Sequence, residues 1–167
     1  CDLAAIEQQF HHFVRTVPRS GLIVANAIDT ALARVLSKGC WTPVEHFDTS
    51  RSWQAKALDA DSFRVSFAGQ DQGRVHWDLQ GEHNRSNALA AIAAARHAGV
   101  DPRAACAALG RFDNVKRRME LRGTVGGIAV YDDFAHHPTA IATTVAGLRH
   151  KVGTARILAV LEPRSNT

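Results

Sequence analysis

Two carboxylates and two imidazoles lie close together in the run 131–138 (Tyr-Asp-Asp-Phe-Ala-His-His-Pro). Asp132 and Asp133 can accept hydrogen bonds from ribose hydroxyls or hold a cation through water. His136 and His137 can donate to a phosphate or orient another group. The alternative is structural, with Asp133 capping a turn and the histidines simply exposed. Because adjacent histidines face different directions, a metal site built from both is disfavoured.

A second polar group falls in residues 81–89 (Gly-Glu-His-Asn-Arg-Ser-Asn-Ala-Leu). Asn84 and Asn87 are three residues apart, so they share one face of a helical turn. An asparagine amide offers one acceptor and two donors, which matches the edge of a purine. Asn84 can instead be the N-cap of a helix, and a capping role is compatible with ligand binding.

Two further segments carry polar groups that suit an anionic ligand. The first is Lys116-Arg117-Arg118, where a guanidinium fork in a hinge can reach a terminal phosphate. The alternative for this segment is a solvated basic loop. The second is the run 162–166 (Glu-Pro-Arg-Ser-Asn), which follows an apolar stretch and offers Arg164 as a ligand candidate or forms a connecting loop.

The first part of the chain predicts the elements that position these groups. Apolar spacing predicts a helix over 2–17, and Asp29 can cap a second helix that ends before Gly39. Between and after them, the pattern predicts strands at 22–25 and 41–47. A two-fold alternation over 52–79 predicts a hairpin that turns at Asp71-Gln72-Gly73.

The second part predicts an alanine-rich helix over 85–98 and a shorter one to about Leu109, with Asp101 as its N-cap and Pro102 at its first position. A change of character at 111–122, with several basic residues among few apolar ones, predicts a domain junction. Beyond it we expect the following elements: a hairpin over about 119–131 turning at Gly126-Gly127, a helix from Pro138 to about Lys151, and a strand over 156–161. Strand, helix and strand in this order predict a parallel βαβ crossover, and ligands gather where such strands end.

Composition narrows the functional class. The chain has 167 residues, of which 46% are hydrophobic and 22% charged, with a net charge of +4. This basic excess fits a nucleotide as well as a nucleic acid, but the basic residues are scattered, so nucleic-acid binding is not expected. Three cysteines without a CxxC pair favour buried thiols in a reducing cytoplasm. No apolar run reaches the roughly 18 residues of a membrane span.

The motifs together resemble those of the Mur ligase family, the ATP-dependent amide-forming enzymes of peptidoglycan synthesis. The family's Gly-x-His-Asn-x-x-Asn-x-x-Ala motif matches 81–90, its interdomain arginine matches Arg118, and its Asp-[Tyr/Phe]-[Ala/Gly]-His-x-Pro motif matches 133–138. The resemblance covers essentially the whole chain. It implies an α/β fold with part of the central ATP-binding domain over 1–110, a hinge over 111–118 and the first part of a Rossmann-like C-terminal domain over 119–167.

Within the family, three stretches are similar nearly word for word to members that join a murein tripeptide to UDP-N-acetylmuramate: 9–12, 39–43 and 161–167. This implies a ligase of peptidoglycan recycling that uses ATP and Mg²⁺ and acts as a cytoplasmic monomer. Its substrates would be UDP-N-acetylmuramate and L-alanyl-γ-D-glutamyl-meso-diaminopimelate. The alternatives are a ligase that adds L-alanine to the same nucleotide sugar, or a non-catalytic nucleotide-binding module.

The resemblance also implies roles for individual residues. It places His83, Asn84 and Asn87 against adenine, Asp133 near the ribose, Arg118 at the γ-phosphate with His136 as a second catalytic residue, and Arg164 on the substrate side. The chain contains no Gly-x-x-Gly-Lys-[Ser/Thr] phosphate loop and lacks the family's magnesium-binding glutamate and histidine. It begins with cysteine and ends directly after an apolar stretch, so we expect a piece of a longer protein that is inactive alone.

Overall fold

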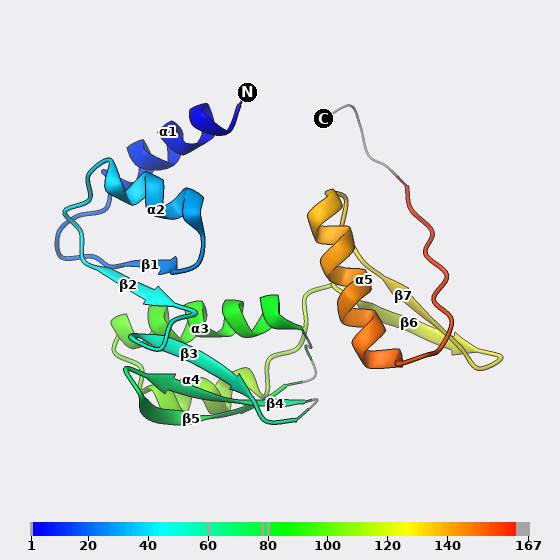
Figure 1. Ribbon diagram of the computed structural model, residues 1–167. Helices are drawn as coiled ribbons and strands as arrows, with labels where there is room; N and C mark the ends of the chain where they lie inside the picture. The colour runs from blue at the N-terminus through cyan, green and yellow to red at the C-terminus, as the bar shows by residue number, and fades with distance from the viewer. Residues whose placement is uncertain (1, 60, 78, 80, 163–167) are drawn as a thin grey trace. The chain divides into compact units, whose positions relative to one another are not determined.

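The computed structural model describes residues 2–59, 61–77, 79 and 81–162. The chain forms two compact units, which are considered separately below. The first comprises Cys1–Asp78 and Asn84–Arg111, and the second Leu79–His83 and Phe112–Thr167. Figure 1 colours the first from blue to green and most of the second from yellow to red. None of the helices in the described ranges is long and apolar enough to cross a membrane.

The first unit contains a mixed five-stranded sheet whose strands lie side by side in chain order. The strands are β1 (Ile23–Asn26), β2 (Val44–Phe47), β3 (Trp53–Ala57), β4 (Ser62–Phe67) and β5 (Gln70–His76). The pairs β1–β2 and β2–β3 are parallel, and the pairs β3–β4 and β4–β5 are antiparallel. Because Asn26 pairs with Phe47, the parallel strands β1 and β2 end at the same edge of the sheet.

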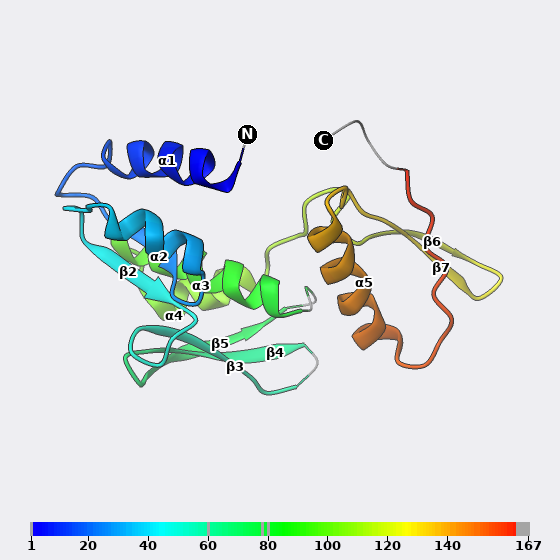
Figure 2. The ribbon, with the colours of Figure 1, turned by 45° about the horizontal axis from the view of Figure 1, so that its top comes forward.

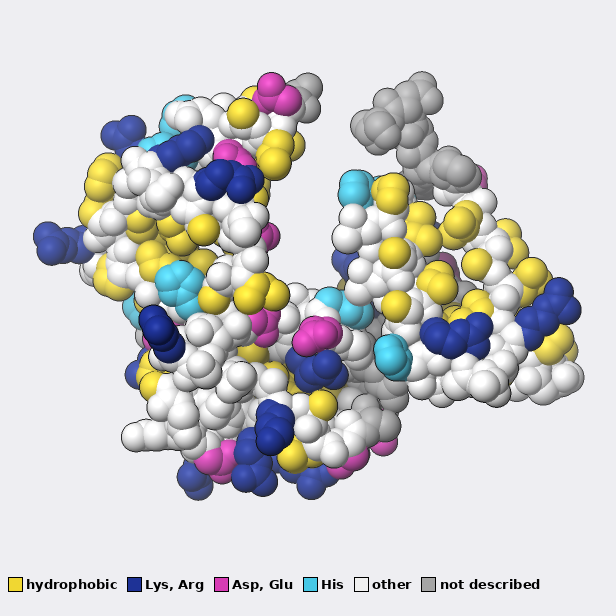
Figure 3. All heavy atoms as spheres, viewed as in Figure 1, with side chains coloured by type: hydrophobic (Ala, Val, Ile, Leu, Met, Phe, Trp, Pro, Cys, Tyr) yellow, Lys and Arg dark blue, Asp and Glu magenta, His cyan; other side chains and the backbone are white. Residues whose placement is uncertain are grey.

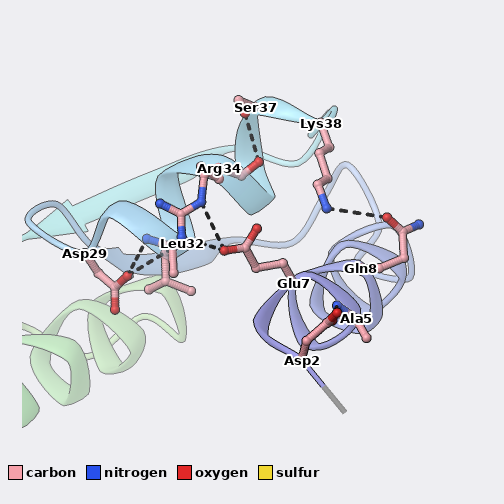
Figure 4. A network of polar contacts seen from close by, with 10 residues as sticks. Asp2, Ala5, Glu7, Gln8, Asp29, Leu32, Arg34, Ser37 and Lys38 are labelled. Atoms are coloured by element: carbon pink, nitrogen blue, oxygen red, sulfur yellow. Dashed lines mark hydrogen bonds and ion pairs between the residues drawn. The ribbon is translucent and has the colours of Figure 1, made fainter.

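Four helices complete the first unit: α1 (Leu3–Val14), α2 (Thr30–Ser37), α3 (Glu82–His97, whose first two residues group with the second unit) and α4 (Pro102–Leu109). The predicted caps at Asp29 and Asp101 are confirmed, since each carboxylate accepts two backbone N–H groups of the following turn. Helices α1 and α2 lie side by side, joined by an ion pair of 2.6 Å between Arg34 and Glu7 (Figure 4).

The core of the first unit lies between α3 and the sheet. Trp53, Val65 and Val75 of the strands are fully buried, as is Leu89 of α3. The guanidinium of Arg96, in the last turn of α3, lies 4.6 Å from the centre of the Phe67 ring. The long helix is therefore fixed to the sheet by apolar contacts along its length and by a cation–π contact near its end.

The apolar stripe predicted for the first helix is present, but most of it faces outward. Phe10 and Phe13 are half or more exposed, while Glu7 and His11 are buried. The two phenylalanines line the mouth of an apolar groove of about 170 Å³ between α1, β1 and α2. Amphipathic spacing therefore predicted the helix correctly. It did not predict that the charged Glu7 would be buried against α2.

The predicted hairpin turn at Asp71-Gln72-Gly73 is wrong. The strands reverse at Ala68 and Gly69, both with positive φ (48° and 80°), as a two-residue turn with mirror-image geometry requires. Gly73 instead lies within β5 beside a register shift in the ladder. Its φ of +132° is a conformation that other residues rarely adopt, and this accounts for glycine at the irregular position of the ladder.

The second unit contains an antiparallel hairpin and one helix, shown from two directions in Figures 1 and 2. Strand β6 (Glu120–Val125) pairs with β7 (Ile128–Asp132), and the predicted turn at Gly126-Gly127 is confirmed. Helix α5 (Pro138–Val152) begins at the predicted proline. Figure 3 shows hydrophobic side chains on the surface of this unit. Val125 and Ile128, on either side of the hairpin turn, are exposed.

The predicted strand over 156–161 does not form in the structure. These residues have no assigned secondary structure, and Leu158 and Val160 are 79% and 89% exposed. The parallel βαβ crossover expected from the strand–helix–strand order is therefore absent among the described residues. The physical reason is that a strand is stabilised by its ladder of hydrogen bonds, and β6 and β7 pair only with each other here.

Candidate functional site

The three residues predicted to contact adenine lie in the first turns of α3. The helix begins at Glu82, three residues earlier than predicted. Asn84 is therefore inside the helix, and the alternative that it is the N-cap is wrong. Asn87 follows one turn later and is exposed, and its side chain has no hydrogen-bond partner within the described part of the chain. Its amide is thus available to a ligand.

Gly81 precedes this helix in a conformation that favours glycine. Its backbone has φ +102°, which other residues rarely adopt. A Cβ at this position would lie 2.9 Å from Cε1 of the His83 ring, a contact that a small movement of that flexible side chain would relieve. The backbone conformation is therefore the physical reason for glycine at this position of the Gly-x-His-Asn run.

A cluster that the sequence analysis did not identify contacts the same turn of α3. The Asp48 carboxylate, just after β2, accepts hydrogen bonds from Nδ2 of Asn26 at 3.0 Å and from Oγ of Ser86 at 2.6 Å. Asn26 is the last residue of β1, and Ser86 lies on α3 between the two asparagines. Their positions at adjacent strand ends could have indicated this cluster, but the contact with Ser86 depends on the tertiary fold.

In the second unit, Asp133 connects three segments. Its carboxylate accepts from the backbone N–H of Met119 and of Ala135, both at 2.8 Å, and from the Thr144 hydroxyl at 3.3 Å. The side chain is half-buried. The capping alternative is therefore realised through the bond to Ala135. A carboxylate has about four lone-pair sites, so three bonds leave capacity for a further donor.

The basic segment before β6 lies against the Asp133 loop. The N–H of Phe134 donates to the Arg117 carbonyl at 2.8 Å. The Arg117 guanidinium lies 5.1 Å from the centre of the Phe134 ring and 3.5 Å from the Asp132 carboxylate. The structure thus brings the segment containing Arg118 together with the predicted ribose residue, within one unit.

Arg117 and Arg118 differ in how they use their charge. Arg117 is committed to Asp132 and Phe134, whereas the exposed side chain of Arg118 contacts no polar partner among the described residues. The carbonyl of Arg118 accepts from the Asn114 side chain, which fixes its backbone. Arg118 therefore combines a fixed backbone with a guanidinium that is available to an anion.

The two histidines have different roles. His137 is the N-cap of α5, since its Nδ1 accepts from the N–H of Thr139 at 3.3 Å. His136 is exposed, and its Nδ1 lies 3.0 Å from the Phe134 carbonyl. Because a carbonyl only accepts, Nδ1 must carry the proton, and Nε2 of the neutral ring is an acceptor. Within the described residues each ring thus keeps its Nε2 for a ligand, as an acceptor in neutral His136 and as a donor in His137, whose Nδ1 accepts.

Hydrogen bonding also sets the charge state near this loop. The backbone N–H of Arg117 and then the Arg122 guanidinium hold the pKa of the Glu120 carboxyl below its usual value.

Within the described ranges, no group of three or more His, Cys, Asp or Glu side chains could hold a metal ion. Arg164, predicted to face the substrate, lies outside the described residues.

Two family models match the chain. The Mur ligase middle domain matches residues 2–95, and the Mur ligase glutamate ligase domain matches residues 117–167. The matched regions contain the start of α3 and the loop of Asp133, respectively. The family resemblance and the α/β fold class predicted from the motifs are thereby confirmed.

Known proteins are similar along the whole chain. An Escherichia coli protein named UDP-N-acetylmuramate–L-alanyl-γ-D-glutamyl-meso-2,6-diaminoheptandioate ligase is 56% identical over 99% of this chain and 37% of its own length. A crystal structure of a murein peptide ligase from Psychrobacter arcticus is 48% identical, with a TM-score of 0.75, over 99% of this chain and 36% of that one. A UDP-N-acetylmuramate–L-alanine ligase from Paenarthrobacter aurescens is 38% identical over 95% of this chain and 36% of its length. The chain thus spans little more than a third of each.

Proposed function

Since this chain belongs to the Mur ligase family, we propose that the protein containing it is an ATP-dependent ligase that joins L-alanyl-γ-D-glutamyl-meso-diaminopimelate to UDP-N-acetylmuramate. The observation that carries the proposal is the difference in identity between the relatives. The relative named for the tripeptide is 56% identical, and the relative named for L-alanine is 38% identical. We further propose that the enzyme is a cytoplasmic monomer of peptidoglycan recycling.

The reaction forms an amide in two steps. The carboxylate of UDP-N-acetylmuramate first takes the γ-phosphate of ATP, which gives an acyl phosphate and ADP. The amino group of the tripeptide's L-alanine then attacks the acyl carbon, and the tetrahedral intermediate expels phosphate. Negative charge accumulates on phosphoryl oxygens in the first step, so cationic groups that lie near them stabilise the transition state.

Several residues are proposed to contact ATP, each considered within its own unit. Asn84 and Asn87, with His83, are assigned to adenine, which fits the exposed amide of Asn87, since it has no hydrogen-bond partner among the described residues. Asp133 is assigned to the ribose, where its remaining lone-pair capacity can accept a hydroxyl proton. Arg118 is assigned to the γ-phosphate.

The remaining assignments concern catalysis and domain organisation. His136 is assigned to the catalytic site with Nε2 as its free nitrogen, and Arg164 to the acceptor substrate. We propose that residues 111–118 form a hinge between a domain over 1–110 and one over 119–167. Mg²⁺ would neutralise phosphate charge when it is bound, but the described residues do not form a site for it, so none of them is assigned to the metal.

The decisive experiment supplies the full-length protein with UDP-N-acetylmuramate, ATP and either the tripeptide or L-alanine. Phosphate release and the masses of the nucleotide products are measured. We expect product with the tripeptide and little with L-alanine. Consumption of L-alanine alone would identify the alternative ligase, and nucleotide binding without any product would identify a non-catalytic module.

The isolated 167-residue chain is proposed to be inactive, because it contains no phosphate loop. Robust ATP hydrolysis or ligation by this chain alone would contradict that proposal. Sequencing the coding region upstream of Cys1 gives an independent check. A Gly-Lys-Thr loop and a magnesium-binding glutamate upstream support the ligase, whereas a start codon near Cys1 supports the module.

A further inference from the structure

Asp48 has a strained backbone and a carboxylate that contacts two other elements. Its φ is +61°, a region that residues other than glycine adopt mainly where their surroundings enforce it. The side chain is half-buried directly after β2. Both of its described hydrogen bonds converge on one oxygen, Oδ2. The conformation of Asp48 is thus determined from β1 on one side and α3 on the other.

Asn26 fixes the strand side of this cluster. Its Oδ1 accepts from the N–H of Ile28 at 2.9 Å, so its Nδ2 must be the group that faces Asp48. The N–H of Ala27 donates to the Phe47 carbonyl at 2.9 Å, which extends the pairing between the ends of β1 and β2. Oδ2 of Asp48 is therefore held at a defined position on the sheet edge.

Ser86 connects this oxygen to α3. Its hydroxyl donates to the carboxylate over 2.6 Å, the short distance typical of a charge-assisted bond. Ser86 lies between Asn84 and Asn87 in the sequence, so fixing Ser86 also fixes the rotation of the turn that carries both asparagines. The next turn is anchored separately, because Ala88 and Leu89 are fully buried.

We infer that Asp48, through Ser86, is a positioning residue that fixes the first turns of α3 so that Asn84 and Asn87 meet the adenine edge. This inference rests on the proposed function, which assigns the two asparagines to adenine. Hydrogen bonds to charged groups contribute more than neutral ones, so loss of this bond loosens the part of the helix that precedes the buried Ala88. Displaced asparagine amides then bind adenine less tightly and distinguish it less well from other purines.

Glu45, on the strand that precedes Asp48, provides a matched control. Its carboxylate accepts from Nε1 of Trp53 at 2.5 Å and from the Arg96 guanidinium at 2.9 Å. Like Asp48, it connects β2 to α3, but it does so at the last turn of the helix. Removing either carboxylate's charge weakens the attachment of α3, whereas only Asp48 is connected to the turn with the asparagines.

The test compares Ser86→Ala, Asp48→Asn and Glu45→Gln in the full-length protein. The measurements are the KM for ATP, kcat, thermal stability and the ratio of kcat/KM for ATP to that for GTP. We expect Ser86→Ala and Asp48→Asn each to raise the KM for ATP about tenfold and to lower the ATP-to-GTP ratio, with kcat changed less. Glu45→Gln is expected to lower the melting temperature and to keep the KM for ATP within about twofold.

Two results would overturn the inference. The first is that Ser86→Ala and Glu45→Gln have the same KM for ATP and the same ATP-to-GTP ratio of kcat/KM. The second is a double variant of Asp48→Asn and Ser86→Ala whose fold-change in KM equals the product of the two single fold-changes. Because both substitutions remove the same hydrogen bond, their effects on KM should not be independent. Should Asp48→Asn fail to fold, Ser86→Ala alone decides. A wild-type protein without ATP-dependent turnover would instead refute the proposed function.

Discussion

Every buried hydrophobic side chain in the described part of the chain belongs to the first unit, whereas none of the second unit's described residues is buried. The first unit holds α3 in place with side chains such as Trp53 and Leu89. The second holds its polar loop with hydrogen bonds to Asp133 and with the contacts of Arg117. The candidate site residues are therefore held by apolar burial in the first unit and by polar bonding in the second.

The difference has a consequence for tolerance to substitution. Truncating a side chain in a packed core removes its contacts and leaves a cavity, and both lower the free energy of unfolding. Exposed apolar side chains can be replaced with little loss of stability. A carboxylate that joins three segments behaves differently again, because its removal leaves several donors without an acceptor.

The largest contrast is expected between two leucines. Leu89→Ala in α3 should lower the free energy of unfolding by about 2–5 kcal/mol, because its side chain is fully buried and leaves a cavity. Leu121→Ala in β6, where the side chain is 55% exposed, should lower it by less than about 1 kcal/mol. Native-state hydrogen exchange of peptides from each unit measures both. Equal losses would show that the second unit contains a core of its own.

The next effect concerns the carboxylate that joins the polar loop. Asp133→Ala in the full-length protein removes the acceptor of three donors and the proposed ribose contact, so kcat/KM for ATP should fall by about tenfold to a hundredfold. Binding of UDP-N-acetylmuramate, measured by calorimetry, should change little. Thr144→Ala removes one weak donor and serves as the mild control. An equal loss of ATP use and UDP-sugar binding would contradict the assignment of Asp133.

Two neighbouring arginines should separate function from stability. Arg118→Ala should lower kcat/KM for ATP by at least about tenfold with little change in melting temperature, because its guanidinium makes no polar contact among the described residues. Arg117→Ala should lower the stability of the loop, since it loses the contacts with Asp132 and Phe134. Steady-state kinetics and thermal denaturation are compared for both. The opposite pattern would make Arg117 the phosphate ligand.

The smallest effect is a difference in how the units respond to pH. Burial raises the pKa of the Cys106 thiol in the first unit to about 11. The folded state then binds the proton more tightly than the unfolded state, so this contribution to stability decreases as the pH rises from about 9 to 11. Cys106 should also react slowly with iodoacetamide at neutral pH, and more slowly than the less buried Cys40, as peptide mass spectrometry can determine. Equal alkylation rates would contradict the burial.

The second unit should respond at the acidic end instead. The pKa of Glu120 is lowered in the folded state, so its contribution is present above the usual value near 4.5 and decreases as the pH falls through the folded value. The stability difference between wild type and Glu120→Gln should therefore shrink on acidification. A difference that stays constant from pH 7 to about 3 would show that Glu120 does not have a lowered pKa.

Local sequence signals predicted much of the fold and the residues of the candidate site. Asp29 and Asp101 cap the helices expected after them, and the paired glycines at 126 and 127 form the expected turn. These features depend on backbone geometry and on side-chain bonds within a few residues, so adjacent residues contain the information. The motifs of residues 81–90 and 133–138 indicated the family for the same reason, because their residue types and spacing are visible in the chain.

Contacts between distant segments were decided only by the tertiary structure. The sequence could not show that Gly73 lies within β5 rather than in a turn, nor that residues 156–161 have no partner strand among the described residues. It also did not show that Ser86 donates to Asp48, 38 residues earlier. The type and spacing of residues determine what chemistry is available, but a hydrogen bond forms only where packing brings donor and acceptor within about 3 Å of each other.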